Sequence, residues 1–350
     1  MHKPGQHSKM GRKRMKTQET SRTESARWAW NGAVGTENGC RARLAGLPWR
    51  NKTGKKLIWG YELVTATRMK TWIAAVLVLL FGALAPDAGA AHQAPVRIGL
   101  TATFPNDQYR ALEEWRRYLE RRLERPVEFV RRDSYAEAMD LLRLQKIDFA
   151  WVCEYPFVFF KGQMKLLAIP LYRGRPYYQS YLIVPAGDRS TRSITQLEGT
   201  VFAYADPYSN TGYLSPRFDL QQAGYDPQQF FRKTIFTWSH RKTVEAVASG
   251  LAQGGAVSSH VWETLSTVKP ELTAATRVVA TSAEFGFPPF VARTEIGAAV
   301  FDDLQRVLLT MSEDEDGRRL LRQLNLDGFM RGDPALYDRV DSMIRSFSAQ

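Results

Sequence analysis

Cysteine is scarce in this chain, which contains only Cys40 and Cys153 among its 350 residues. Two distant cysteines exclude a disulfide-stapled scaffold, so the folded part must be held by its own hydrophobic core. Several enzyme motifs are also missing, including Gly-x-Ser-x-Gly, Gly-x-x-x-x-Gly-Lys and His-Glu-x-x-His. These absences weaken the case for an enzyme, and we expect neither a cofactor nor a metal site.

Net charge is also absent from most of the chain. The formal charge of the whole sequence is +12, but residues 1–70 contain 16 Lys or Arg and only 4 Asp or Glu. Residues 71–350 therefore hold 32 basic and 32 acidic side chains. A folded part without net charge has no general attraction to a polyanion, which argues against a nucleic-acid-binding protein.

Residues 69–90 have the features of a secretory signal peptide. A basic start is followed by the uncharged run Thr71–Pro86 and then by small residues that suit a signal peptidase. The run would reach about 24 Å as a helix, short of the roughly 30 Å core of a bilayer, which disfavours a membrane anchor. We predict a periplasmic protein. Residues 1–68 are read as a spurious or disordered basic leader, with a cytoplasmic tail on an uncleaved anchor as the alternative.

Short apolar runs alternate with amphipathic segments from residue 95 onward. This first series predicts strands at 96–100, 127–131 and 147–152, separated by helices at 106–125 and 134–145. Strands that alternate with helices pair in parallel through right-handed crossovers. The pattern therefore predicts an α/β sheet that is covered on both faces.

A second series of elements interrupts the first. It starts with a predicted strand at 178–185, and the chain returns through predicted strands at 277–280 and 290–293. Between them we predict strands at 200–205, 233–238 and 255–258, and helices at 212–223, 241–250 and 260–268. Three helices are predicted in the tail. The first covers 297–310, the second follows a capping box Ser312-x-x-Glu315, and the third starts at Asp333-Pro334.

The interruption predicts two α/β lobes joined by two crossings. We assign residues 95–180 and 281–350 to lobe 1 and residues 181–280 to lobe 2. Ligands of such sheets bind outside the carboxyl ends of the strands, which here places them between the lobes.

The segment Ala205–Pro216 (ADPYSNTGYLSP) comes directly after a predicted strand and opens a helix. Ser209, Asn210 and Thr211 would present side-chain donors beside the free backbone N–H groups of the first helical turn, where a small oxyanion can bind. The alternative is an ordinary Ser or Asn cap at the start of a helix.

This segment resembles the phosphonate/phosphite/phosphate-binding proteins of ABC transporters, the PhnD family of periplasmic binding proteins. The family pattern Asp-Pro-x-Ser-x-Ser/Thr-Gly-x-Leu-x-Pro is matched from Asp206 to Pro216. Further matches span residues 95–345 and include Asp133–Tyr135, Ile147–Trp151, Tyr178–Val184, Ser239-His240, Ala246–Ala248 and Pro289–Arg293. The resemblance implies a type II periplasmic binding protein fold, with two α/β sandwiches that close on a ligand and dock on a membrane permease.

The resemblance also assigns roles to single residues. It places Ser209–Thr211 in a cradle for the anion and His240 on the anionic head group, with helix capping as the alternative for the histidine. Tyr135 and Tyr178 fall where family tyrosines wall the cleft. Their alternative is packing as half-buried aromatics.

The acidic positions of the family are changed here. Aminophosphonate binders place two carboxylates opposite the ligand's ammonium group, and those positions align with His260 and Pro288. His260 remains a candidate ligand-binding residue, and 2-aminoethylphosphonate is expected to bind poorly. Glu154, beside Cys153, could restore an acid in the cleft, which the sequence leaves open.

The resulting hypothesis is an extracytoplasmic solute-binding protein of an ABC importer, with a small phosphorus oxyanion as ligand. Its partners are expected to be that anion and an ABC permease in the inner membrane, without nucleic acid, and the protein is expected to be a monomer. One alternative is a ligand sensor of the same fold that feeds a membrane signalling protein. Another is a type II-fold enzyme that uses Cys153 as nucleophile, resembling pyrimidine-precursor synthases.

Overall fold

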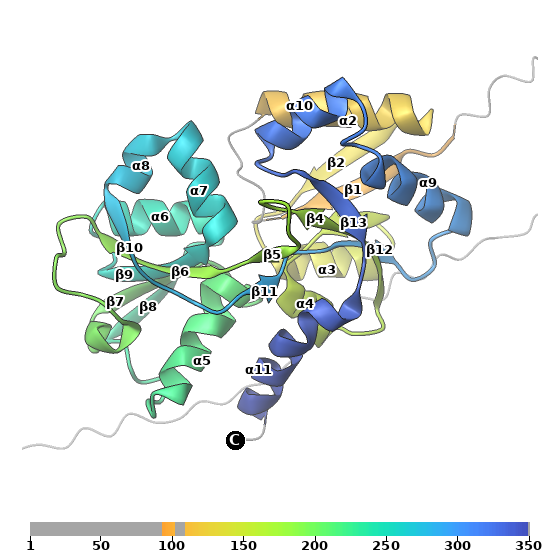
Figure 1. Ribbon diagram of the computed structural model, residues 1–350. Helices are drawn as coiled ribbons and strands as arrows, with labels where there is room; N and C mark the ends of the chain where they lie inside the picture. Colours follow the sequence, from red (N-terminus) through yellow and green to blue (C-terminus); the bar gives the residue numbers. More distant parts are fainter. Residues whose placement is uncertain (1–92, 102–108, 349–350) are drawn as a thin grey trace, which may run out of the picture. The chain divides into compact units, whose positions relative to one another are not determined.

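The computed structural model describes residues 93–101 and 109–348 (Figure 1). The predicted leader 1–68, the predicted signal peptide 69–90 and Cys40 lie outside these residues. Among the described helices, none is long and apolar enough to cross a membrane. The described strands form a six-stranded sheet, a five-stranded sheet and a two-stranded ladder.

The six-stranded sheet has the order β13-β4-β12-β3-β1-β2. Its strands are β1 (Val96–Leu100), β2 (Val127–Arg131), β3 (Phe149–Trp151), β4 (Met164–Leu171), β12 (Phe290–Arg293) and β13 (Gly328–Arg331). β1 pairs in parallel with β2 and with β3, as the order of elements predicted. β12 runs antiparallel to β3 and β4, and β13 runs antiparallel to β4. Neither β4 nor β13 was predicted from the sequence.

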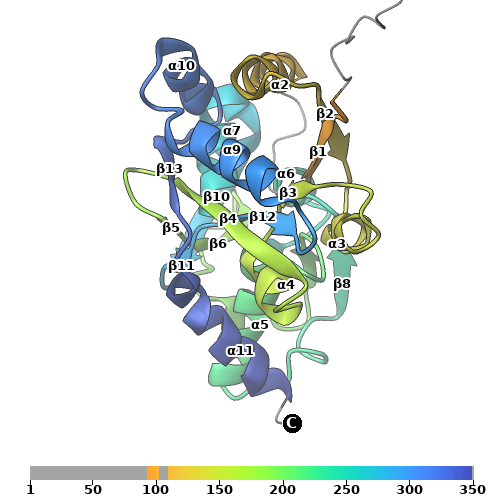
Figure 2. The same ribbon diagram turned by 90° about the vertical axis from the view of Figure 1, so that its right-hand side faces the viewer.

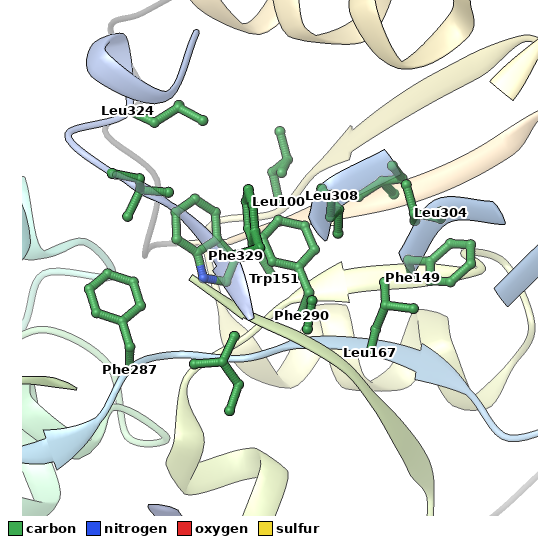
Figure 3. Close-up of a cluster of buried hydrophobic side chains, with 14 of the residues drawn as sticks. Leu100, Phe149, Trp151, Leu167, Phe287, Phe290, Leu304, Leu308, Leu324 and Phe329 are labelled. Atoms are coloured by element: carbon green, nitrogen blue, oxygen red, sulfur yellow. The ribbon is translucent and has the colours of Figure 1, made fainter. Parts of the chain in front are cut away.

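Both faces of this sheet are covered, which confirms the prediction of an α/β sheet. Phe149 and Trp151 point to one face, where they join a core cluster with side chains of α2 (Tyr109–Leu123), α9 (Ala298–Leu309) and α10 (Glu315–Gln323) (Figures 2 and 3). Ala150 and Val152 point to the other face, where they pack with α3 (Tyr135–Arg143). The period of two along the strand thus separates two apolar layers.

The five-stranded sheet has the order β10-β6-β9-β7-β8. Its strands are β6 (Ser180–Pro185), β7 (Val201–Tyr204), β8 (Lys233–Phe236), β9 (Gly254–Ser258) and β10 (Thr276–Thr281). β7 pairs in parallel with β8 and β9, whereas β6 runs antiparallel to β9 and β10. Because β7 and β9 are parallel neighbours, the segments that follow them leave the sheet at the same edge.

Helices cover this second sheet on both faces as well. Ile183, Ala203 and Val257 share a core cluster with side chains from α6 (His240–Ala248) and α7 (Ser259–Val268). Leu182, Val184 and Phe202 belong to another cluster, which includes Leu220 of α5 (Ser215–Gln222). The remaining short helices are a 3₁₀ turn at Ile194–Leu197 and α8 (Pro270–Ala274).

The chain passes between the two large sheets twice. The first passage contains β5 (Tyr177–Tyr178) and the second contains β11 (Phe285–Gly286), and these two short strands pair antiparallel with each other. The predicted strand at 178–185 is therefore two strands, separated at Gln179.

Two predicted helix starts need correction. The first turn of α10 is capped by Asp314, whose carboxylate accepts from the Gly317 N–H at 2.7 Å, and not by the predicted capping box at Ser312. Asp333 does cap the next element, by accepting from the Ala335 N–H at 3.0 Å, but that element is a 3₁₀ turn (Pro334–Tyr337). The final helix, α11 (Asp338–Ser348), follows it.

Gly317 gives a direct test of the packing around α10. A Cβ at this position would lie 1.8 Å from the backbone oxygen of Met311, which cannot move aside as a flexible side chain can. Gly317→Ala should lower the free energy of unfolding by about 1–3 kcal/mol, measured by urea titration. Gly187→Ala is the control, because a Cβ there meets nothing within 4 Å. Equal stability of the two variants would contradict the described packing.

Candidate ligand-binding site

The segment after β7 forms a turn that leads into a short π-helix at Asn210–Leu214, followed directly by α5. Ser209 precedes the π-helix, and its Oγ accepts from the Gly212 N–H at 2.9 Å. The predicted helix start is therefore present, but its first turn is wider than an α-helical turn. Ser209, Asn210 and Thr211, which we call the cradle residues, are all fully buried.

Gly212 is needed for the close packing of this turn. A Cβ on Gly212 would lie 2.5 Å from Ala205 Cβ, 2.9 Å from Ser209 Oγ and 3.1 Å from His240 Cε1. The glycine therefore lets Ser209 and His240 approach each other across the turn. This approach is what brings the two predicted site residues into one place.

His240 is buried at the start of α6, and its ring nitrogens have different partners. Nδ1 accepts from the backbone N–H of Ser258 at 3.2 Å, which leaves the proton of the neutral ring on Nε2. Nε2 lies 3.4 Å from Ser209 Oγ. Burial lowers the pKa of His240 to about 3, so the ring is a neutral donor at pH 7. The alternative of a histidine that caps a helix is wrong, because the helix begins at His240 and Ser239 is its N-cap.

The Ser209 hydroxyl thus receives two donors, from Gly212 N–H and His240 Nε2–H. A hydroxyl has two acceptor lone pairs and one proton. With both lone pairs engaged, the proton of Ser209 is left to donate to a third group.

The two predicted cleft tyrosines are both buried. The backbone N–H of Tyr135 donates to Asp206 Oδ2 at 3.1 Å, and its side chain packs with Cys153 and Tyr208. Asp206 also accepts from the Tyr208 N–H at 2.7 Å, so this buried carboxylate ties the start of α3 to the cradle segment. In the sequence, Asp206 is only the first position of the motif, and nothing there indicates that its carboxylate is buried.

Glu154, which the sequence left open as an acid in the cleft, contacts the cradle residue Asn210. It is the first residue of α4 (Glu154–Phe159) and is completely buried. Its carboxylate accepts from the Tyr178 hydroxyl at 2.6 and 2.8 Å and from Asn210 Nδ2 at 2.5 Å. The Cys153 thiol donates to Glu154 Oε2 at 3.1 Å. We refer to Cys153, Glu154, Tyr178 and Asn210 as the Glu154 cluster.

His260 lies in a different set of contacts. Its Nε2 is 3.0 Å from the Leu324 carbonyl oxygen, and its ring packs edge-on against Tyr172 and Phe287. Burial lowers the pKa of His260 to about 4. Its Nδ1 is buried without a hydrogen-bond partner in the described part of the chain. No hydrogen bond of the described residues joins His260 to the cradle residues, in contrast to His240.

Nearby, Glu263 of α7 accepts hydrogen bonds from the hydroxyls of Tyr172 and Tyr181 and forms an ion pair with Arg173. Asn325 Nδ2 also donates to Thr264 Oγ1 at 3.0 Å. Tyr181 belongs to β6 of the five-stranded sheet, but the contacts to Tyr172, Arg173 and Asn325 and the contact of His260 to Leu324 join α7 to segments that adjoin the six-stranded sheet. They form a second polar connection between the two halves, apart from the Glu154 cluster.

The chain forms two α/β sheets and passes between them twice, and polar side chains gather where the strands end. This arrangement is that of a type II periplasmic binding protein. The family model "ABC transporter, phosphonate, periplasmic substrate-binding protein" matches residues 98–337. The chain therefore belongs to the family of periplasmic substrate-binding proteins of ABC phosphonate transporters.

Individual relatives are distant. The protein "Probable ABC transporter phosphite binding protein PhnD1" of Prochlorococcus marinus (strain MIT 9301) is 23% identical over 163 residues. That match covers 45% of this chain and 55% of the relative, so this chain spans about half of the length of the relative.

Solved structures share the fold over most of their length. A binding protein component of an ABC phosphonate transporter from Pseudomonas aeruginosa superposes with a TM-score of 0.67 at 20% identity, covering 71% of this chain and 85% of that one. Prochlorococcus marinus PhnD1 in complex with methylphosphonate gives a TM-score of 0.65 at 20% identity, covering 72% and 98%.

The buried histidines make stability depend on pH. In the unfolded chain a histidine has a pKa of about 6.5, so below that value the unfolded state binds a proton that the folded state, with the His260 pKa at about 4, does not. The free energy of unfolding should therefore fall by about 1.2 kcal/mol for this residue as pH drops from 6 to 5. Glu154 and Asp206, whose pKa values burial raises, act in the opposite direction.

A comparison of the wild type with one variant isolates the contribution of His260. The difference in unfolding free energy between the wild type and His260→Gln should shrink as pH falls from 7 to 5, because glutamine keeps a donor for Leu324 but takes up no proton. Denaturant titrations at each pH supply the measurement. A difference that stays constant over this range would mean that His260 titrates normally in the folded protein.

Proposed function

We propose that this chain is an extracytoplasmic solute-binding protein of an ABC importer and that it binds a small phosphorus oxyanion at the cradle residues. The candidates are phosphate, phosphite and a phosphonate. Family membership and the names of the relatives support this class of ligand. The cradle itself supports the position of the ligand.

The observation that carries the proposal is the unused hydrogen-bonding capacity of two buried hydroxyls. Ser209 has both lone pairs engaged, so its proton needs an acceptor. Thr211 Oγ1 is buried without a hydrogen-bond partner among the described residues, although the Tyr178 hydroxyl is near it. A buried hydroxyl left unpaired costs about 1–3 kcal/mol. An anion that accepts from both hydroxyls would remove this cost, and hydrogen bonds to a charged group contribute about 1.5–3 kcal/mol each.

The thiol of Cys153 gives little support to the alternative of an enzyme. Burial and the neighbouring Glu154 raise the pKa of this thiol well above its usual value. The thiol form predominates at pH 7, whereas the thiolate is the nucleophile in cysteine catalysis. Cys153 also accepts from the Asn210 N–H at 3.2 Å, which is a structural contact to the cradle.

The arrangement of strands supports further parts of the proposal. We propose lobe boundaries at 95–180 plus 281–350 and at 181–280. Apart from Ser180 and Thr281, at the ends of β6 and β10, the strands of the two large sheets come from these ranges. We also propose an inner-membrane ABC permease as partner, a periplasmic location after cleavage at the signal peptide, and a monomeric state. A sensor that presents the same ligand-bound form to a membrane signalling protein differs from this only in its partner.

Removal of both hydroxyls tests the cradle. Ser209→Ala combined with Thr211→Ala should weaken methylphosphonate binding by about 2–5 kcal/mol, because both donors to the anion are lost. Isothermal titration calorimetry measures the affinity. Thr234→Ala on β8 is the control, since Thr234 is exposed and pairs with Phe202 of β7 rather than with a residue of the cradle. An affinity for methylphosphonate that is unchanged in the double variant would remove the cradle from the account.

A further inference from the structure

Glu154 is an unusual residue to find beside an anion-binding site, because an ionised carboxylate repels a negatively charged ligand. Its carboxylate is completely buried, and the donors that the structure describes for it are the Tyr178 hydroxyl, the Asn210 amide and the Cys153 thiol. All three donors are neutral. A buried carboxylate without a cation is costly, and a fully ionised ligand beside it would add repulsion between like charges.

The carboxylate also fixes the orientation of the Asn210 side chain. Nδ2 donates to Glu154 Oε1 at 2.5 Å, so the amide must turn its oxygen away from the carboxylate. That oxygen, Asn210 Oδ1, is buried and has no hydrogen-bond partner in the part of the chain that the structure describes. Asn210 Oδ1 is thus an unpaired acceptor on the same turn as the Ser209 and Thr211 hydroxyls, whose protons need an acceptor. A ligand that both accepts and donates hydrogen bonds would pair all three groups.

The same side chains bring the ligand and Glu154 together. Asn210 is a cradle residue and Tyr178 a predicted cleft residue, and the Glu154 carboxylate contacts both. Asn210 thus connects the Glu154 carboxylate to the turn that carries the Ser209 and Thr211 hydroxyls.

We propose that Glu154 is a specificity-determining residue that requires the bound oxyanion to carry one proton. The ligand would accept from the Ser209 and Thr211 hydroxyls through its ionised oxygens and would donate from a P–OH group to Glu154 or to Asn210 Oδ1. This inference rests on the proposed function and narrows its ligand class to monoprotonated phosphorus oxyanions.

The requirement separates two classes of ligand with nearly the same shape. A phosphoryl group has a second ionisation not far from neutral pH, at about 6 in phosphorylated side chains, so it can bring a proton at little cost. Sulfate and alkylsulfonates are strong acids that carry no proton at this pH. A site built to accept a hydrogen bond from a ligand hydroxyl rejects the analogue that lacks it, because the buried acceptor is left unpaired.

Methylphosphonate and methanesulfonate are a matched pair for the test. Calorimetric titration at pH 7.5 should show that the wild type binds methylphosphonate at least about 100-fold more tightly than methanesulfonate. Glu154→Gln keeps the shape of the side chain but removes its charge and supplies an amide donor. In this variant methanesulfonate should bind more tightly than in the wild type, and the ratio should fall below about 10-fold.

Glu263→Gln is the control, because Glu263 also accepts from two tyrosine hydroxyls but contacts none of the cradle residues in the described hydrogen bonds. Its ratio should match that of the wild type. A wild-type ratio near one, or a Glu154→Gln ratio equal to that of the wild type, overturns the proposed role of Glu154. If Glu154→Gln does not fold, the wild-type ratio alone decides.

The two proposals fail in different ways. A wild type that binds methylphosphonate without discriminating against methanesulfonate leaves the oxyanion-binding function standing and removes only the role of Glu154. A wild type that binds neither methylphosphonate, phosphate nor phosphite at millimolar concentration contradicts the proposed function and, with it, the inference that rests on it.

Discussion

The pair of hydrogen bonds that converge on Ser209 Oγ determines how the rest of the site is arranged. One comes from Gly212 in the same turn, and the other comes from His240, whose tautomer is set by the Ser258 N–H at the end of β9. Because β7 and β9 are parallel neighbours, the segments after them leave the sheet together. The sheet topology thus brings together the two donors to Ser209 Oγ, which leave the Ser209 proton to donate to another group.

Burial gives these few polar contacts their importance. The cradle residues, His240 and Glu154 are all enclosed, so each donor and acceptor must find a partner in the protein or in a ligand. Most of them do. Among the described contacts of these residues, Thr211 Oγ1 and Asn210 Oδ1 have no hydrogen-bond partner, and both lie on cradle residues. Unpaired groups at adjacent positions of one turn are better explained by a ligand than by two separate defects in packing.

The sequence was sufficient for the order of the elements but not for every strand or for the contacts of the site. The parallel series β1, β2 and β3 followed from clear alternation of apolar and amphipathic segments. β4 was missed because its apolar run contains Pro170 and has no alternation. β13 was missed because it begins with a glycine and has only two apolar residues, Phe329 and Met330. The family resemblance located Ser209, Asn210, Thr211 and His240, and the structure places His240 beside Ser209. It could not show that Glu154 reaches Asn210, since this contact joins residues 56 positions apart.

A crystal structure of the protein with a bound phosphorus oxyanion is the most direct test of this account. The account predicts the anion within hydrogen-bond distance of the Ser209 and Thr211 hydroxyls, with one of its oxygens facing Glu154 or Asn210 Oδ1. An anion held at another place in the molecule, with Ser209 and Thr211 unchanged and unpaired, would contradict it.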